Sequence, residues 1–269
     1  MRLPAGIGIA WRRETAWLIQ CRPDLVFSEV LAENVDPRDP PAPLAALLER
    51  GTPLIPHGVG LSLGGAEALA PARLEHLAAL AQVLRAPFVS EHVAFVRAGG
   101  LDSGHLLPVP RTREALRVLI ENVQQAARTL PVPLVLENIA TLFEWPENEL
   151  SEAEFLSVLF EETGAGWLLD ASNLYANVKN HGWDLDAFLE RAPLERVAYV
   201  HVAGGSVADG LYHDTHAHPL GEGPLAVLER VLRRTGPRPV LLERDRNFGG
   251  RRELEAELSA IAEVVGHAA

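Results

Sequence analysis

The sequence predicts an α/β fold, a closed (β/α)₈ barrel, from three observations. Short runs rich in Leu, Val and Ile recur along the chain, and stretches with helical periodicity separate them. Two of the runs, GWLLDA at 166–171 and PVLLERD at 239–245, are apolar on both faces of the pleat, which is typical of parallel strands covered on both sides. The length of 269 residues fits one such barrel.

Eight candidate strands and five clear helices can be placed in order. The strands are 6–10, 25–31, 53–57, 88–92, 134–138, 167–171, 197–202 and 240–243. The helices are 66–84, 112–130, 152–163, 223–234 and 253–264. An open doubly wound sheet is the rival, but no GxGxxG turn follows the first strand. No change in composition marks a boundary, so we expect one domain over residues 1–269.

Composition excludes several classes of function. Cys21 is the only cysteine, so internal disulfides and Cys-based zinc or iron–sulfur sites within this chain are excluded. There is no P-loop motif, and a net charge of −12 disfavours general affinity for nucleic acid. No run of eighteen apolar residues predicts a membrane span, and no signal peptide is evident. We therefore expect a cytoplasmic protein.

Nearly every predicted strand ends in an ionisable or amide residue. In a barrel these ends converge on one rim, where active sites are built. The principal candidates are His57, His92, Glu137, Asp170, His201 and Glu243. A strand-end histidine is often only hydrogen-bonded, and a carboxylate can cap the following helix. Recurrence at successive strands favours a shared site. Glu91 is adjacent to His92 on its strand, so its side chain is expected on the opposite pleat face, in a salt bridge behind the barrel.

The charges at this rim favour bound cations. Glu137, Asp170 and Glu243, joined by Asp214 from a long loop, cannot all ionise at short range without compensation. Imidazole and carboxylate without thiolate suit Fe, Mn, Zn or Co, and so many donors suit two or three ions sharing bridging carboxylates. In Asp214-Thr-His216, a spacing of two on an extended segment would place both side chains on one side, where they can chelate one ion.

Two interpretations are open for Asp245, and two for the Asn-rich run that follows the sixth strand. Asp245 either orients a ligand or binds substrate. The Asn-rich run after the sixth strand either forms loop hydrogen bonds or brings amides to the metal site. Its members are Asn173, Asn177, Asn180 and His181.

Motifs spread in order over nearly the whole chain resemble one known family. They are GIGIA at 6–10, AEN at 32–34, HGVGLSLGG at 57–65, SEHVAF at 90–95, LLPVP at 106–110, LEN at 136–138, LLDASNLYANVKNHG at 168–182, HVAG at 201–204, DTHAHP at 214–219 and LLERD at 241–245. The chain resembles the MbnB/TglH-like multinuclear iron enzymes of peptide natural-product biosynthesis, long catalogued as an uncharacterised protein family. It departs from the family pattern near the rim, at 11–13, 35 and 202–205.

The resemblance implies a xylose-isomerase-like TIM barrel with a metal centre of two or three iron ions, zinc or manganese being alternatives. His57 and His92 look like ligands of one iron, and Asp170 and His201 like ligands of a second. Glu137 and Glu243 look like bridging carboxylates. Asp214 and His216, with Asn173, look like the site of a third, more labile ion.

The resemblance also implies a reaction and partners. Characterised members use dioxygen to oxidise a cysteine of a bound precursor peptide, often with a small partner protein. Three alternatives stay open: a metal-dependent sugar isomerase or epimerase, a trinuclear metal phosphodiesterase, which the net charge of −12 disfavours, and a non-catalytic metal-binding protein. No catalytic residue beyond the metal centre is predicted.

Overall fold

Eight parallel strands close into a barrel in the computed structural model, which describes residues 3–268. Around the barrel, neighbours follow the order β1-β12-β9-β8-β7-β4-β3-β2. The strands are β1 (Gly6–Trp11), β2 (Phe27–Leu31), β3 (Leu54–His57), β4 (Val89–His92), β7 (Leu134–Glu137), β8 (Gly166–Asp170), β9 (Val197–Val202) and β12 (Pro239–Leu242). The predicted barrel is confirmed, and no strand boundary differs by more than two residues from its prediction.

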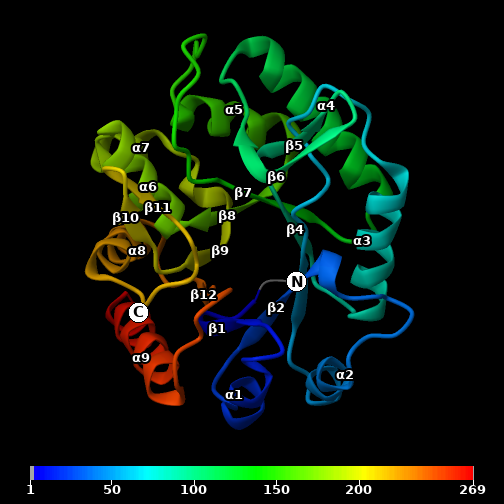
Figure 1. The fold of residues 1–269 in the computed structure, drawn as a ribbon, viewed down its shortest axis with the longest axis vertical. Coiled ribbons are helices and arrows are strands. Elements are labelled where there is room, and N and C mark those ends of the chain that lie inside the picture. Colours follow the sequence, from blue (N-terminus) through cyan, green and yellow to red (C-terminus); the bar gives the residue numbers. More distant parts are fainter. Residues whose placement is uncertain (1–2, 269) are drawn as a thin grey trace.

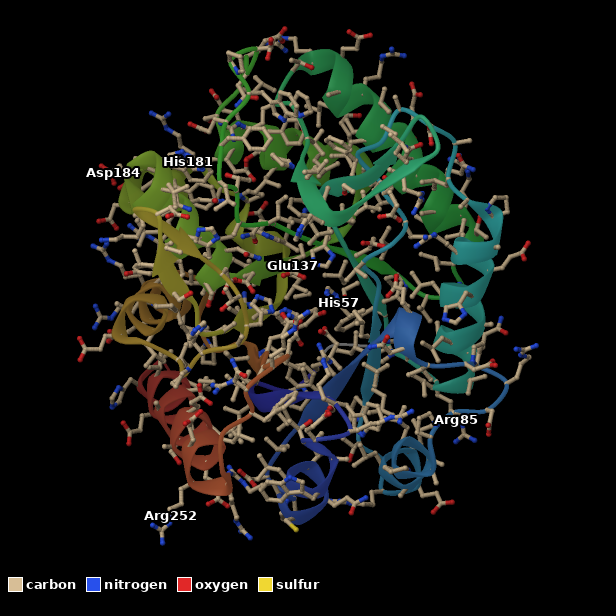
Figure 2. All side chains as sticks on the ribbon, viewed as in Figure 1. His57, Arg85, Glu137, His181, Asp184 and Arg252 are labelled. Carbon is tan, nitrogen blue, oxygen red and sulfur yellow. The ribbon has the colours of Figure 1, made fainter. Side chains whose placement is uncertain are left out.

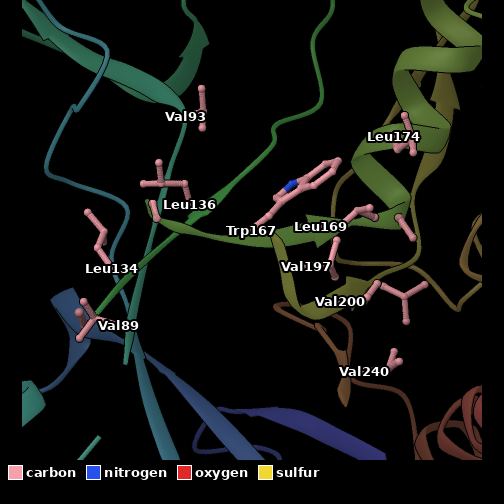
Figure 3. Packing of buried hydrophobic residues seen from close by; sticks show 14 of the residues in the cluster. Val89, Val93, Leu134, Leu136, Trp167, Leu169, Leu174, Val197, Val200 and Val240 are labelled. Atoms are coloured by element: carbon pink, nitrogen blue, oxygen red, sulfur yellow. The ribbon is translucent and has the colours of Figure 1, made fainter. Parts of the chain in front are cut away.

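Helices surround the strands on the outside of the barrel (Figure 1). They are α1 (Ala16–Cys21), α2 (Ala42–Glu49), α3 (Pro71–Val83), α4 (Arg113–Thr129), α5 (Glu152–Thr163), α6 (Ala171–His181), α7 (Leu185–Arg191), α8 (Glu222–Thr235) and α9 (Arg251–His267), with short 3₁₀ turns η1 (Ala32–Asn34) and η2 (Leu194–Arg196). Outward-facing strand residues such as Leu136, Leu169 and Val200 belong to the apolar layer beneath the helices (Figure 3). No helix among residues 3–268 combines the length and apolar character that crossing a bilayer requires.

The predicted helix 66–84 is wrong at its start, because α3 begins at Pro71. Proline suits the first helical turn, where its missing N–H would have no partner in any case. The turn just before residue 66 is tied to α4. The side-chain amide of Asn122 donates to the carbonyls of Leu63 and Gly65 at 2.8 and 2.9 Å.

The Asn-rich run is helix α6, although we did not predict a helix there. The side chain of Asp170 caps it by accepting from the backbone N–H of Asn173, and Gly182 ends it in the left-handed conformation. Asn177 and Asn180 lie within the helix and use their amides outside it. They donate to the carbonyls of Ile139 and Tyr212, respectively, at 2.9 Å each, and so hold the rim loops.

Side chains pointing into the barrel form two layers. The lower layer is apolar and draws one residue from or beside each strand: Ala10, Phe27, Ile55, Phe88, Val135, Leu168, Tyr199 and Leu241. Side chains of a strand alternate between faces, so the residue two positions further along points inward as well. On most strands that residue is a histidine or a carboxylate. The interior of the barrel is therefore filled by apolar side chains in the lower layer and lined by polar side chains nearer the carboxyl ends of the strands.

Two hairpins that the sequence did not predict extend from the barrel. The first joins β5 (Ala94–Ala98) to β6 (Leu101–Pro108) directly after β4, and the second joins β10 (Ser206–Ala208) to β11 (Leu211–His213) after β9. Each follows the carboxyl end of a barrel strand, so both lie on the rim that carries the polar layer. The second leads directly into Asp214 and His216.

Candidate metal centre

The structure brings the predicted site residues together at the carboxyl-terminal rim of the barrel. The strand-end residues are His57, His92, Glu137, Asp170, His201 and Glu243, and each is no more than 6% exposed. Asp214 and His216 reach the same place from the loop after β11, and Asn173 from the first turn of α6. Figure 2 shows His57 and Glu137 near the centre of the molecule, far from Arg85 and Arg252 at its periphery.

Glu137 lies between a pair of histidines, His57 and His92, and a third histidine, His201, and presents one carboxylate oxygen to each side. Its Oε2 atom is 3.4 Å from Nε2 of His57 and 3.3 Å from Nε2 of His92. Its Oε1 atom is 3.7 Å from Nδ1 of His201. A carboxylate in this position can bridge two ions.

Glu243 occupies a similar position on the other side of His201. Its Oε2 atom is 3.0 Å from Nδ1 of His201 and 3.3 Å from Nδ1 of His216. Its Oε1 atom is 3.6 Å from the guanidinium of Arg12. Glu243 therefore connects the barrel histidines to the histidine of the rim loop.

Asp170 belongs to two sets of neighbouring residues that could each bind a metal ion, which are called donor groups below. Ligand atoms of Asp170 lie within 4.8 Å of those of Glu137, His201 and Glu243, and also within 4.8 Å of those of Asp214 and His216. Its Oδ1 atom accepts from the backbone N–H of Asn173, which leaves Oδ2 for the centre. The side-chain amide of Asn173 donates to the carbonyl of Asn138 at 3.0 Å and lies 3.4 Å from Glu137.

The predicted pairing of Asp214 with His216 is found, but not on an extended segment. Nε2 of His216 lies 2.9 Å from Oδ2 of Asp214. The backbone of His216 adopts a φ of 51°, in the left-handed region that a non-glycine residue rarely visits. This backbone conformation, and not alternation along an extended segment, turns the imidazole back onto Asp214.

Several polar atoms of the centre are buried without a hydrogen-bond partner. They are Glu137 Oε2, Asp170 Oδ2, His201 Nδ1, Asp214 Oδ1 and Glu243 Oε2. Leaving such groups without a partner costs about 1–3 kcal/mol each, and more for charged groups. Because these atoms converge on one small volume, cations between them would satisfy all of them together. The residues present therefore fit a centre that holds several metal ions.

The protonation of the metal-free centre also favours the binding of cations. Burial, with the neighbouring Asp214 and Glu137 carboxylates, raises the pKa of Asp170 well above its usual value. Burial alone would lower the pKa of His201, but surrounding carboxylates, Glu29 first among them, raise it well above its usual value. In the metal-free protein, protons therefore supply positive charge that bound ions can replace.

Glu29 is the residue of this centre that the sequence reasoning missed. It lies on β2 and is 1% exposed, and its ligand atom comes within 4.8 Å of those of His57 and Glu243. Glu29 lies before the end of its strand, whereas the candidates were strand-end residues. Glu33, just after the end of β2, is exposed and accepts from the backbone N–H of Val59 at 2.9 Å. A signal was present: Glu29 stands two positions after Phe27, an inward-facing residue of the lower layer, and most ligand candidates have the same spacing from that layer on other strands.

Glu91 corrects another expectation. It turns away from the centre, but no arginine or lysine of the described chain forms a salt bridge with it. Its carboxylate accepts from the backbone N–H groups of Leu61 and His92, at 2.8 Å each, and lies 3.4 Å from Nδ1 of His92. A Cβ atom at Gly58 would come within 2.9 Å of this carboxylate, so glycine leaves the space it needs.

Asp245 accepts a hydrogen bond from Nε of Arg12 at 3.0 Å, and its other oxygen lies 3.5 Å from Nδ1 of His216. Asp245 therefore lies between Arg12 and His216. Within residues 3–268, Arg12 is the only arginine that forms a salt bridge with an acidic residue of the centre, Glu243. These contacts favour the interpretation in which Asp245 orients a metal-binding side chain, His216, over the one in which it binds substrate.

Comparison with known proteins identifies the family. A family model described as "RiPP precursor modification enzyme MbnB/TglH/ChrH" matches residues 6–266. The chain belongs to this family. The resemblance found in the sequence motifs is thereby confirmed.

Relatives of the chain carry the name UPF0276 protein. One from Streptomyces avermitilis is 49% identical over 267 residues, covering 97% of this chain but 55% of its own length. One from Chromobacterium violaceum is 35% identical over 270 residues and is covered over 97% of its length. The chain thus spans about half of the first relative and nearly all of the second.

Solved structures confirm the fold class. Endonuclease IV from Thermus thermophilus matches with a TM-score of 0.63 at 22% identity, over 98% of this chain and all of that one. An L-ribulose 3-epimerase matches with a TM-score of 0.67 at 18% identity, over 98% of this chain and 96% of that one. Both share the xylose-isomerase-like barrel, and at this identity the likeness concerns the fold alone.

Proposed function

We propose that this protein is a multinuclear, iron-dependent enzyme that uses dioxygen to modify a cysteine of a precursor peptide. The observation that carries the proposal is the convergence of buried, unpartnered imidazole and carboxylate atoms at the barrel rim. Membership of a family described as precursor modification enzymes supports a peptide as substrate. A small partner protein that presents the peptide, and a cytoplasmic location, belong to the same proposal.

Three ion positions account for the donor groups. The first would be held by His57, His92 and Glu137, and the second by Glu137, Asp170, His201 and Glu243. The third would be held by Asp170, Asp214 and His216, with the side-chain oxygen of Asn173 as a weak additional donor. In this arrangement Glu137 and Asp170 would be shared between neighbouring positions. Glu243, which lies near both His201 and His216, would stand between the second and third positions. Shared carboxylates would keep the ions close enough to act on one substrate.

The chain's own residues position the reaction and exclude water from below. Iron at such a centre supplies the means to bind dioxygen and a substrate thiolate. The apolar layer around Leu168 and Tyr199 closes the barrel beneath the centre. Substrate must therefore enter from the rim, past the two hairpins and the loop that carries Asp214. Arg12, paired with Asp245, is the cation there that can hold an anionic group of the substrate.

A sugar epimerase is the second candidate, because the barrel is similar to that of an L-ribulose 3-epimerase. Such a reaction needs an ion that polarises adjacent oxygens and a carboxylate or histidine that moves a proton. The third donor group, of Asp214, His216 and Asp170, favours the oxidative reaction over this one, because it adds a metal position that proton transfer between carbons does not need.

Metal analysis and oxygen uptake test the proposal. Protein purified without oxygen should contain two to three iron ions per chain by elemental analysis, placed by anomalous scattering at the iron edge. A short cysteine-bearing precursor peptide should then trigger oxygen consumption, whereas the same peptide with serine for cysteine should not. Equal uptake with both peptides contradicts modification of the cysteine. A single ion per chain with no oxygen uptake contradicts the oxidative function and favours the epimerase.

A further inference from the structure

A chain of buried hydrogen bonds beneath the metal centre joins two of its histidines. Its members, in order, are His57, Ser90, Tyr199, Glu29 and His201, and none is more than 2% exposed. Nδ1 of His57 lies 2.9 Å from Oγ of Ser90, which is 2.8 Å from the hydroxyl of Tyr199. That hydroxyl lies 2.6 Å from Oε2 of Glu29, and the same oxygen is 3.1 Å from Nε2 of His201.

Counting protons gives each of these contacts a direction. A carboxylate can only accept, so both Tyr199 and Nε2 of His201 must donate to Glu29. Tyr199 has one proton, so the contact between Ser90 and Tyr199 needs the proton of Ser90. Ser90 then has no proton left for His57, and Nδ1 of His57 must carry one itself. Any other arrangement leaves two buried acceptors in contact without a proton between them, which is costly.

We propose that Glu29 is a positioning residue that sets the tautomers of both His57 and His201 and so aims their free nitrogens at the metal centre. In the metal-loaded protein, with Nδ1 of His57 protonated, its Nε2 atom keeps a lone pair for an ion that would also contact Oε2 of Glu137, 3.4 Å away. With Nε2 of His201 protonated, its Nδ1 atom likewise keeps a lone pair for an ion that would also contact Oε2 of Glu243, 3.0 Å away. The inference rests on the proposed metal centre, since it concerns the orientation of its ligands.

The two histidines depend on Glu29 by different routes. His201 contacts the carboxylate directly, whereas His57 reaches it only through Ser90 and Tyr199. Removing the tyrosine hydroxyl should therefore affect His57 alone, and neutralising Glu29 should affect both histidines. A role of Glu29 as a ligand, or a general packing role, would not produce this difference between the two sites.

The experiment uses the full chain loaded with Zn²⁺, a diamagnetic probe, and labelled with ¹⁵N-histidine. Long-range ¹H–¹⁵N spectra identify which ring nitrogen binds zinc and which carries a hydrogen-bonded proton, and competition with a chelator gives the zinc affinity. For the wild type we expect zinc on Nε2 of His57 and on Nδ1 of His201. Ser28→Ala is the control, because this buried hydroxyl donates to the carbonyl of Ile9 at 2.7 Å and lies outside the chain of contacts.

Two variants decide the inference. Tyr199→Phe should shift the Nδ1–H signal of His57, leave the Nε2–H signal of His201 unchanged and weaken one zinc site by about ten- to a hundredfold. Glu29→Gln should change both histidines, and Ser28→Ala neither. Wild-type zinc binding and spectra in both variants, or zinc on Nε2 of His201, would overturn the inference. So would loss of one whole zinc ion in Glu29→Gln with both histidine patterns intact, since Glu29 would then be a ligand.

Failure of the proposed function gives a different result. A wild-type protein that shows these zinc and histidine patterns, but oxidises no peptide when loaded with iron, contradicts the oxidative reaction and supports the positioning role of Glu29. A protein that oxidises the peptide with unchanged rate and metal content in both variants contradicts the positioning role alone.

Discussion

His92 and Glu137 are register partners on the adjacent strands β4 and β7, and their side chains meet inside the barrel with Nε2 of His92 3.3 Å from Oε2 of Glu137. Parallel strands hold neighbouring side chains of one face side by side, so this pair is set by the backbone ladder. The Nδ1 atom of His92 faces the carbonyl of Gly58 at 3.1 Å, which leaves Nε2 for the centre. The sheet thus holds these two side chains within 3.3 Å of each other, where both could reach one ion.

Removing the metal should lower thermal stability. Ions that bind only the folded chain stabilise it by about 3 kcal/mol at a hundredfold excess over Kd. For a chain of this size that corresponds to a fall in Tm of roughly 6–12 °C on chelation. Differential scanning calorimetry before and after dialysis against a chelator measures it, and readdition of iron should restore the original Tm. An unchanged Tm would show that ions are not integral to the centre.

Substitution in the rim loop should remove one ion and no more. Asp214→Ala deletes a carboxylate that belongs to the third donor group and to neither of the other two. We expect the iron content of saturated protein to fall from three ions per chain to two. Asp186→Ala serves as the matched control, because that carboxylate pairs with Arg230 and Arg234 on the outer surface. If Asp214→Ala retains three ions, the assignment of the third position is wrong.

The stability gained from metal should grow with pH. In the metal-free protein, burial alone would lower the pKa of His92, but Glu137 and Glu91 raise it from 6.5 to about 9. A proton held more tightly in the folded state stabilises it fully below pH 6.5, and this contribution is lost as the pH rises through about 9. A bound ion replaces that proton, so the metal-dependent rise in Tm should increase over this interval.

Melting curves of metal-free and metal-loaded protein from pH 6 to 9.5 check this dependence. His267→Ala should not alter it, because His267 is exposed at the end of α9. A rise in Tm that is the same at every pH would contradict the predicted exchange of proton for metal.

The apolar layer below the centre should contribute strongly to folding. Leu168 is fully buried in this layer, so Leu168→Ala removes packed methyl groups and leaves a cavity. We expect a loss of about 2–5 kcal/mol in the free energy of unfolding, measured by urea denaturation. Leu101→Ala is the control, because Leu101 is 76% exposed on the first hairpin and should change stability by less than about 0.5 kcal/mol. Equal effects of the two substitutions would contradict the role given to the layer.

The sequence by itself determined the barrel and most of the centre. Short apolar runs alternating with amphipathic helices predict parallel strands, and a parallel barrel brings every strand end to one rim. His57, His92, Glu137 and His201 were therefore predictable from their positions at strand ends. Their approach follows from topology, which the order of elements along the chain already implies.

The tertiary structure decided what depends on side-chain phase and on loop conformation. Glu29 belongs to the centre because barrel closure turns its pleat face inward, and its spacing of two from Phe27 identifies that face only once the inward residues of the barrel are known. His216 meets Asp214 through a left-handed backbone that nothing in the local sequence specifies. The Asn-rich run forms a helix because its amides find partners on neighbouring rim loops. Such long-range contacts override local propensity, because their partners come together only when the barrel closes.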